Sequence, residues 1–144
     1  MTEFYDPNQV QVSLGGVLLD GFADGTMIEV EPASDDYEAK VGTKGDVGVA
    51  RIYNPLATVK LRFLQTSQAN DRLSTLRNSS RAATASGFAA AFSVRDASGT
   101  TKVQGTAWIQ KRPTTTMSNT VEAREWTIMV RESSSFIGGN TSAP

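Results

Sequence analysis

Short stretches in which polar and apolar residues alternate are the feature that most constrains the fold of this chain. Residues 9–14 alternate in this way, and so do residues 26–31, whose apolar members Ile28 and Val30 share one side. A repeat of two residues is the period of a β-strand that has one buried and one solvated face. The alternation therefore predicts a mainly β protein.

Turn-forming residues separate these stretches. Gly15-Gly16 can supply the positive φ angles of a tight turn, and Asn54-Pro55 interrupts two further alternating runs. The pattern predicts about seven or eight strands, most of them joined as antiparallel neighbours by short turns. They are expected at residues 9–14, 17–19, 26–31, 47–53, 56–64, 88–94, 101–110 and 121–130.

One helix is predicted after the strand at 56–64. Ala69, Leu73 and Leu76 recur at the spacing of one helix face, and Ser67 precedes them as a capping residue. The apolar stripe is narrow, which favours a helix that packs flat on a sheet. The expected fold is an antiparallel β-barrel or sandwich with one packed α-helix.

The length of 144 residues predicts a single domain spanning residues 1–144. Three segments are expected to lie outside its core. Residues 1–8 form an N-terminal arm, and residues 33–46 form a long loop or protruding hairpin, which is too long to be only a connector. Residues 133–144 are rich in Ser, Gly and Asn and are expected to be a flexible C-terminal tail.

The residue content argues against catalysis. The chain has no histidine and no cysteine, so the commonest general base, nucleophilic thiol and metal ligands are missing. The acidic residues Asp35, Asp36 and Glu38 lack the spacing of a calcium loop. Gly42-Thr43-Lys44-Gly45 lacks the spacing of a phosphate loop and is typical of a hairpin turn. We expect no enzyme activity, no metal and no cofactor.

Charge and hydropathy limit the partners. The net charge of −1 and the pI near 5.4 argue against tight binding of nucleic acid, which requires clustered Lys and Arg. Trp108 and Trp126 are accordingly expected in the core or at a subunit contact. The N-terminus lacks the features of a secretory signal, and no run approaches the roughly 18 apolar residues of a membrane span. We therefore expect no membrane partner.

The order of several motifs resembles that of phage tail-tube proteins. In residues 61–76, LRFLQTSQANDRLSTL, a strand ends in a polar Gln-Thr-Ser-x-x-Asn-Asp run that precedes the helix, as in that family. Further segments resemble the family in the same order, so that the similarity covers about residues 9–139. They are Asp96-x-x-Gly99-Thr100-Thr101, Thr106-Ala107-Trp108-Ile109-Gln110-Lys111-x-Pro113, Arg124-Glu125-Trp126 and Phe136-Ile137-Gly138-Gly139.

The resemblance implies a structural virion protein of a contractile-tailed phage. Such a subunit forms hexameric rings in which the sheets join into a continuous barrel, and the rings stack around a lumen through which the genome passes. The implied partners are further copies of the chain, the tail sheath, the baseplate hub, the tail terminator, a tape measure protein in the lumen, and passing DNA that is not bound sequence-specifically. The implied location is the virion tail, assembled in the host cytoplasm.

Three alternatives remain at this stage. A pyocin-like or secretion-system tube would share the rings but carry no DNA. A monomeric β-sandwich that binds carbohydrate or protein would present an exposed aromatic platform and form no rings. An enzyme would need a site built from carboxylates alone, and this has the least support because no paired acids face each other at strand ends.

Candidate positions follow from the tube interpretation. A DNA channel should repel phosphate weakly, so Glu29 and Glu31 are candidates for the lumen, with an ordinary solvated face as the alternative. Acidic residues of the 33–46 segment are expected to meet Arg72 or Arg77 of a neighbouring ring or protomer. The candidate contact residues are Phe4, Tyr5, Asp35, Asp36, Tyr37, Glu38, Lys40, Lys44, Arg72 and Arg77.

Overall fold

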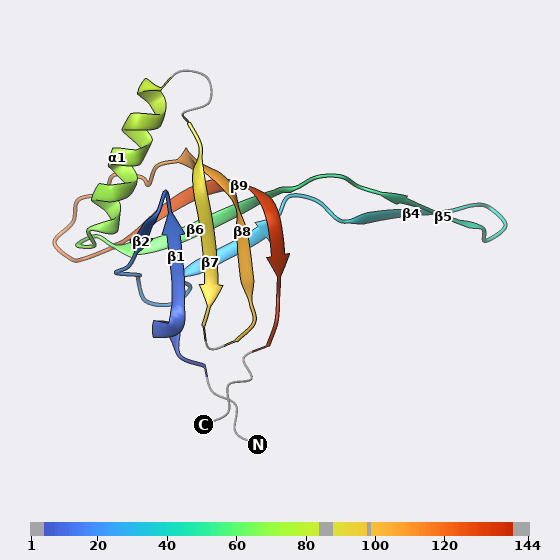
Figure 1. Ribbon diagram of the computed structural model, residues 1–144, viewed down its shortest axis with the longest axis horizontal. Coiled ribbons are helices and arrows are strands. Elements are labelled where there is room, and N and C mark those ends of the chain that lie inside the picture. Colours follow the sequence, from blue (N-terminus) through green and yellow to red (C-terminus); the bar gives the residue numbers. More distant parts are fainter. Residues whose placement is uncertain (1–4, 84–87, 98, 140–144) are drawn as a thin grey trace.

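The main element of the structure is a single antiparallel sheet of seven strands. The computed structural model describes residues 5–83, 88–97 and 99–139. The strands lie in the order β2-β1-β7-β8-β9-β6-β3, and every pairing is antiparallel (Figure 1). The strands are β1 (Val10–Leu14), β2 (Val17–Leu19), β3 (Ile28–Pro32), β6 (Leu56–Leu64), β7 (Ala90–Asp96), β8 (Lys102–Lys111) and β9 (Ala123–Phe136).

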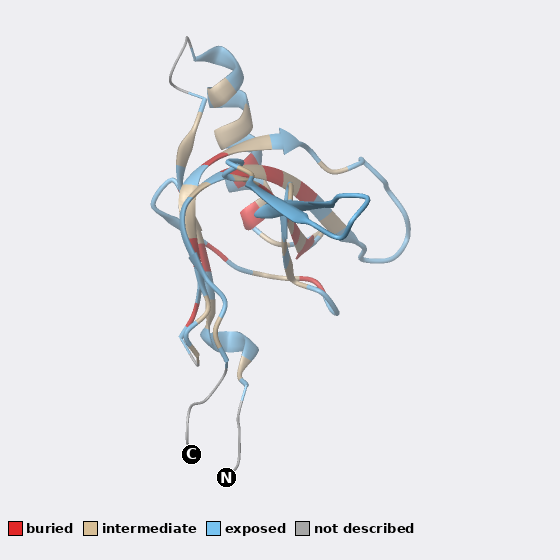
Figure 2. Ribbon diagram, turned by 90° about the vertical axis from the view of Figure 1, so that its right-hand side faces the viewer, coloured by how far each residue is buried: buried red, intermediate tan, exposed pale blue. Residues whose placement is uncertain are grey.

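The sheet is strongly curved but open, and the predicted barrel or sandwich is wrong for the single chain. Closing a sheet into a barrel requires its two edge strands to pair with each other. Here β2 pairs only with β1, and β3 pairs only with β6, so no closed barrel forms among the described strands. Figure 2 shows the sheet bending around a band of buried residues. The antiparallel, mainly β character is confirmed.

The core lies on the concave side of the sheet. Alternate residues of β6 are buried, with Val59, Leu61 and Phe63 at 0% exposure, which is the pattern predicted from the alternation. The Phe63 ring stacks on Phe22 with 4.9 Å between ring centroids. The same cluster includes side chains from β1, β2, β7, β8, β9 and the helix. Ile28 and Val30 of β3 are partly buried and pack against this cluster, so one continuous core holds all seven strands together.

Helix α1 (Ala69–Ala82) lies at one end of the sheet and packs on the core through its N-terminal half, so the predicted packed helix is confirmed (Figure 1). Ala69 and Leu73 are buried in the core, and Leu76 packs against it. A single 3-10 turn, η1 (Pro7–Gln9), precedes the first strand. No helix in the described part of the chain has both the length and the apolar character needed to cross a membrane.

The C-terminal strand is longer than predicted, and the prediction of a flexible tail that begins at residue 133 is wrong. Ser134 and Ser135 pair with Gln104 and Val103 of β8, and β9 continues to Phe136. The start of β8 would otherwise have an unpaired edge, so backbone hydrogen bonding outweighs the low strand preference of serine. The described segment then reaches Gly138, whose carbonyl accepts a 2.9 Å hydrogen bond from Thr101 Oγ1. Residues 140–144 lie outside the described residues.

A second, two-stranded sheet projects from the first as a hairpin (Figure 1). It consists of β4 (Tyr37–Val41) and β5 (Val47–Arg51). The protruding hairpin predicted at 33–46 is thus present with different bounds, and the strand predicted at 47–53 is its second arm. Its turn is closed by hydrogen bonds from Gly42 N to Asp46 O at 2.6 Å and from Gly45 N to Gly42 O at 3.0 Å, as the glycine motif predicted.

Candidate assembly surfaces

The hairpin β4–β5 has one apolar and one polar face. Residues directly opposite each other in an antiparallel pair share a face, and successive residues alternate between faces. The pairs Tyr37–Arg51, Ala39–Val49 and Val41–Val47 therefore lie on one side, which we call the apolar face of the hairpin. The other side carries Glu38, Lys40, Gly48 and Ala50.

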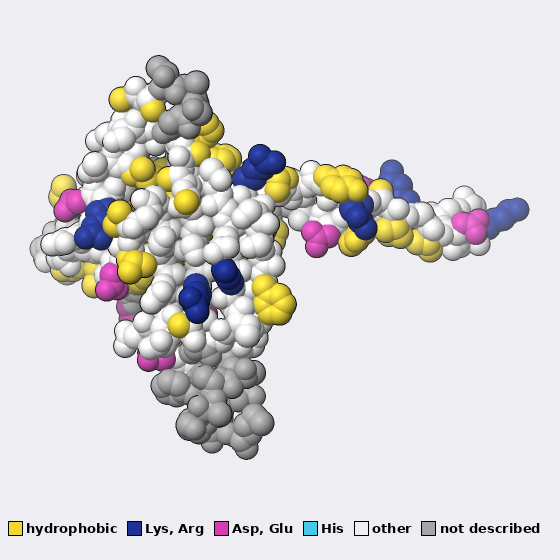
Figure 3. Space-filling model, in the orientation of Figure 1, with side chains coloured by type: hydrophobic (Ala, Val, Ile, Leu, Met, Phe, Trp, Pro, Cys, Tyr) yellow, Lys and Arg dark blue, Asp and Glu magenta, His cyan; other side chains and the backbone are white. Residues whose placement is uncertain are grey.

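Every residue of both hairpin strands is exposed to solvent. Val41 is 69% exposed and Val49 63%, whereas Val59, Leu61 and Phe63 of β6 are fully buried. The guanidinium of Arg51 lies 5.6 Å from the centroid of the Tyr37 ring and partly covers it. Figure 3 shows hydrophobic side chains along the length of the projection. Because an isolated two-stranded hairpin is at best marginally stable in water, this face requires a covering surface.

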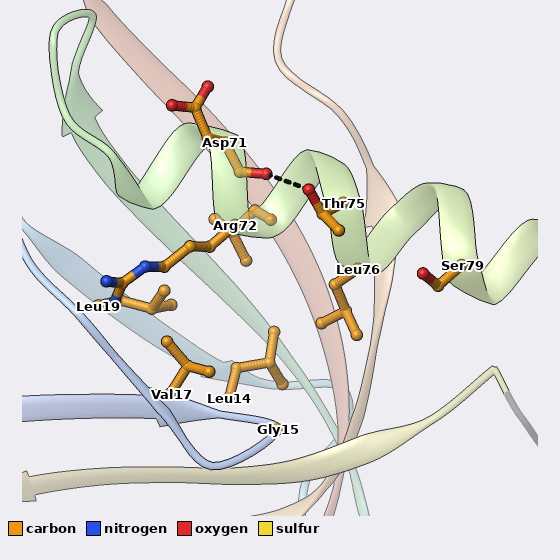
Figure 4. A pocket seen from close by; sticks show the side chains of 10 residues that line it. Leu14, Gly15, Val17, Leu19, Asp71, Arg72, Thr75, Leu76 and Ser79 are labelled. Atoms are coloured by element: carbon orange, nitrogen blue, oxygen red, sulfur yellow. Dashed lines mark hydrogen bonds between the residues drawn. The ribbon is translucent and has the colours of Figure 1, made fainter.

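The second surface is a groove between helix α1 and the turn that joins β1 to β2, which we call the α1 groove. It encloses about 390 Å³. Figure 4 shows Leu14, Val17 and Leu19 on its sheet side, with Leu76 facing them from the helix. Its lining residues are Leu14, Gly15, Val17, Leu19, Asp71, Arg72, Leu73, Thr75, Leu76 and Ser79.

Arg72 spans one end of the α1 groove. Its Nη1 donates a 2.9 Å hydrogen bond to the carbonyl of Leu18 in β2 (Figure 4 shows the side chain reaching toward the sheet). A guanidinium carries five N–H donors, so this bond leaves others for an acceptor outside the chain. Arg77, the other predicted helix contact, is half-buried.

The polar run of residues 64–71 joins three parts of the molecule. Ser67 Oγ donates to the carbonyl of Asp20 at 2.6 Å and accepts from the Ala69 backbone N–H at 3.1 Å. Gln68, not Ser67, is the N-cap residue, and its side chain makes no capping hydrogen bond. The predicted cap is therefore wrong by one residue, although the Ser67 hydroxyl still accepts from the first N–H of the helix. A Cβ atom on Gly21, whose φ is +83°, would clash with the same Oγ. The glycine lets residues 20–21 approach this hydroxyl.

Asn70 connects the helix to β9 and to the end of β6. Its Oδ1 accepts a 3.0 Å hydrogen bond from Trp126 Nε1, and its Nδ2 donates to the Leu64 carbonyl at 2.9 Å. Trp126 is buried, which confirms its predicted place in the core. Trp108 is half-buried, on the outer face of the sheet, and its ring lies edge-on to Phe88 at 5.7 Å. These motif residues hold the fold together.

The predicted lumen residues lie on the outer face of the sheet, the face turned away from α1. Glu29 is opposite Lys60, and Glu31 is opposite Thr58. Register places both basic and acidic side chains on this face: Lys60, Arg62, Arg95, Lys102, Lys111 and Arg131, with Glu29, Glu31 and Glu125. Local charge around the two glutamates is therefore mixed, and their place in a lumen stays a prediction.

The predicted contact residues fall into two separated groups. Asp35, Asp36, Tyr37, Glu38, Lys40 and Lys44 are exposed on the hairpin or at its base, whereas Arg72 and Arg77 lie on α1 on the opposite side of the molecule (Figure 1). The two groups do not meet within one chain. Their meeting across two copies stays a prediction.

The N-terminal anchor is only partly described. Tyr5 is 52% exposed and lines a second cavity of about 620 Å³ together with Ile137 and Met27. Phe4 lies outside the described residues. A contact of either aromatic residue with another subunit stays a prediction.

Reasoning from the sequence did not identify the apolar face of the hairpin. The signal was present, since Tyr37, Ala39 and Val41 alternate with Glu38 and Lys40 before the glycine turn. It was missed because the segment was interpreted through its acidic residues. The α1 groove was also missed, because it depends on which strands the helix covers.

The geometry defines an antiparallel β-sheet protein with two exposed apolar surfaces, the hairpin face and the α1 groove. Comparison with protein-family models gives no match, and no curated protein matches the chain. Among solved structures, the fold is similar to a chain in the cryo-EM structure of the anti-feeding prophage cap, described as the AFP tube terminating cap. The TM-score is 0.55 at 10% sequence identity, over 90% of this chain and 89% of that one. At this identity, the likeness shows a shared fold.

Proposed function

We propose that the chain is a structural subunit of a phage tail tube that forms stacked hexameric rings around a lumen. The observation that carries the proposal is the hairpin β4–β5, whose apolar face is exposed and has no covering surface among the described residues of its own chain. A soluble protein that displays such a projection is expected to bury it against another chain. The motifs of residues 61–76 and the fold shared with a tube-terminating cap give independent support.

The open sheet supports ring formation. Both edge strands, β2 and β3, have one unpaired side within the described part of the chain. Exposed edges are templates for pairing with another chain, and closure into a ring would remove them. In this proposal the curved sheets of neighbouring subunits join into one barrel. The barrel absent from the single chain would thus be completed by the assembly.

The remaining parts of the proposal follow from the same role. The protein has no enzymatic activity of its own and requires no cofactor. It sits in the virion tail, contacts the sheath, baseplate hub and terminator, and encloses the tape measure protein and later the passing DNA. In a phage-tail-like injection machine of the pyocin or secretion type, the same tube would form without DNA.

A second candidate is a subunit that terminates a tube. The solved structure that shares the fold is that of a tube-terminating cap, and this is the observation that favours the candidate. A terminating subunit would form one ring and stop, whereas a tube subunit adds ring on ring. The two roles therefore differ in the assembly that the purified chain forms.

Negative-stain electron microscopy of the purified protein, alone and with a co-expressed baseplate hub, separates these roles. The tube proposal predicts hollow tubes of repeated six-fold rings. Single rings that never stack would support the terminating role instead. Dispersed monomers in both samples would contradict both and favour a monomeric binding module.

A further inference from the structure

We propose that the apolar face of the hairpin β4–β5 of one copy docks in the α1 groove of a neighbouring copy. Asp35 and Asp36, at the base of the hairpin, then meet Arg72 at the end of the groove. The inference rests on the proposed function, because it names the surfaces by which the same subunits join.

The two surfaces match in chemistry. The hairpin offers a row of apolar side chains, among them Val41, Val47 and Val49, that no described residue of its own chain covers. The groove offers aliphatic side chains, among them Val17 and Leu76, along an open depression. Burial of one against the other would remove apolar surface of both from water, which is the main driving force of association.

The two surfaces also match in length. The row from Tyr37 to Val41 spans four residue steps of a strand, which corresponds to about 13 Å. The helix side of the groove runs from Asp71 to Ser79, eight residue steps of a helix, which corresponds to about 12 Å. The hairpin row and the groove are therefore of similar length. An extended strand can lie along the helix without a bend.

Opposite charges lie at the matching ends of the two surfaces. The hairpin base carries Asp35 and Asp36, both exposed, immediately before the apolar row begins. Arg51, opposite Tyr37, adds one positive charge there and lies over the Tyr37 ring, so these three groups together remain net negative. Arg72 is exposed at one end of the groove and uses one of its donors on Leu18. Asp71 also lies at this end, but its carboxylate points away from the groove, so the guanidinium is the charged group that faces the sheet side (Figure 4). Complementary charges of this kind fix the direction of docking.

The hairpin and the α1 groove lie on different sides of the molecule. The hairpin projects from one side of the sheet, and α1 lies at the other (Figure 1). Because the apolar face of the hairpin and the α1 groove lie on opposite sides of one molecule, they cannot cover each other within the same chain. They generate a head-to-tail contact, which closes into a ring or continues as a stack.

Site-directed cross-linking tests the docking, because the natural chain has no cysteine. Val49→Cys, on the apolar face, and Thr75→Cys, in the groove, are purified separately, mixed under assembly conditions and oxidised. A disulfide forms only when the two Cα atoms come within about 7 Å. The proposal predicts a cross-linked heterodimer. Ala50→Cys, on the opposite face of the same strand, is the matched control and should give several-fold less product with Thr75→Cys.

Charge exchange supplies a second measurement. Replacing Asp35 and Asp36 by Lys should weaken the Val49–Thr75 cross-link, and adding Arg72→Glu in the partner should restore it. Equal cross-linking of both faces of the hairpin, or dominant Val49→Cys homodimers from hairpin–hairpin pairing, would overturn the proposal. Failure of the charge exchange to restore the product would overturn the predicted direction of docking.

Microscopy of the same mixtures separates this inference from the proposed function. If tubes form without the cross-link, the docking proposal is overturned while the tube proposal stands. The cross-link without rings or tubes would support the docking and count against the tube. The absence of both would overturn the two together.

Discussion

The main sheet and the projecting hairpin use the same sequence pattern with opposite results. In β6, alternate apolar residues such as Val59 and Leu61 are fully buried beneath α1 and the neighbouring strands. In β4–β5, Val41, Val47 and Val49 alternate in the same way and are each more than 60% exposed. Alternation gives a strand two different faces, but a covering surface must come from elsewhere. The hairpin lacks one among the described residues of its own chain.

The comparison predicts that the two regions have different roles, the sheet in monomer stability and the hairpin in assembly. Substitutions in the sheet and its junction with α1 should change the free energy of unfolding of the monomer. Substitutions on the apolar face of the hairpin should leave that free energy almost unchanged and act on assembly. Four substitutions, from the largest to the smallest expected effect on monomer stability, test this division.

Phe63→Ala should have the largest effect. The side chain is fully buried and stacks on Phe22, so its removal leaves a cavity in the core. We expect a loss of about 3–5 kcal/mol in the free energy of unfolding. Urea denaturation followed by tryptophan fluorescence measures it. A loss below about 1 kcal/mol would show that the core is not organised around β6.

Gly21→Ala should cause the next largest loss in the free energy of unfolding. The residue has a φ of +83°, and an added Cβ would clash with Ser67 Oγ. Gly16→Ala is the matched control, because Gly16 has a φ of +82° with no other described atom within 4 Å of the added Cβ. Backbone strain of about 1–2 kcal/mol should be common to both variants. Equal denaturation midpoints for the two would contradict a close approach between Gly21 and Ser67.

Asn70→Ala should destabilise the junction of α1, β6 and β9. It leaves the buried Trp126 Nε1 without its acceptor and removes the bond to the Leu64 carbonyl. The expected loss is about 1–3 kcal/mol. Asn78→Ala, at an exposed position of the same helix, controls for the change in helix propensity. If thermal unfolding shifts equally in both variants, the junction does not depend on Asn70.

Val49→Ala should have the smallest effect on the monomer. The side chain is exposed, so the free energy of unfolding should change by less than about 0.5 kcal/mol. Assembly into rings or tubes, followed by sedimentation, should nevertheless be weakened. The control is Ala50→Ser, on the other face of the same strand. If Val49→Ala assembles normally but its monomer is destabilised, the prediction that this face acts on assembly and not on monomer stability is contradicted.

Much of the fold was predictable from local pattern. The spacing of Ala69, Leu73 and Leu76 predicted the helix face, and Gly15-Gly16 predicted the turn between β1 and β2. Both features depend on residues close in sequence. Local periodicity and turn chemistry are sufficient for such elements.

The errors arose where distant parts of the chain decide the outcome. Ser134 and Ser135 are in a strand because β8 needs a partner there, which their own preferences do not reveal. The sheet remains open because β2 and β3 do not meet, which depends on the order of all seven strands. The hydrogen bond between Asn70 and Trp126 joins residues 56 positions apart. Of the candidate site, the protruding hairpin was predicted, but its apolar face was not.

Hydrogen exchange of the hairpin amides, measured by mass spectrometry in the monomer and in the assembled protein, tests the central claim most directly. We predict that β4–β5 exchanges rapidly in the monomer, while β6 and β9 are protected in both states. In the assembly, β4–β5 should become strongly protected, because a neighbouring copy covers its apolar face. Equal exchange of the hairpin before and after assembly would contradict the claim that this face exists to join one subunit to the next.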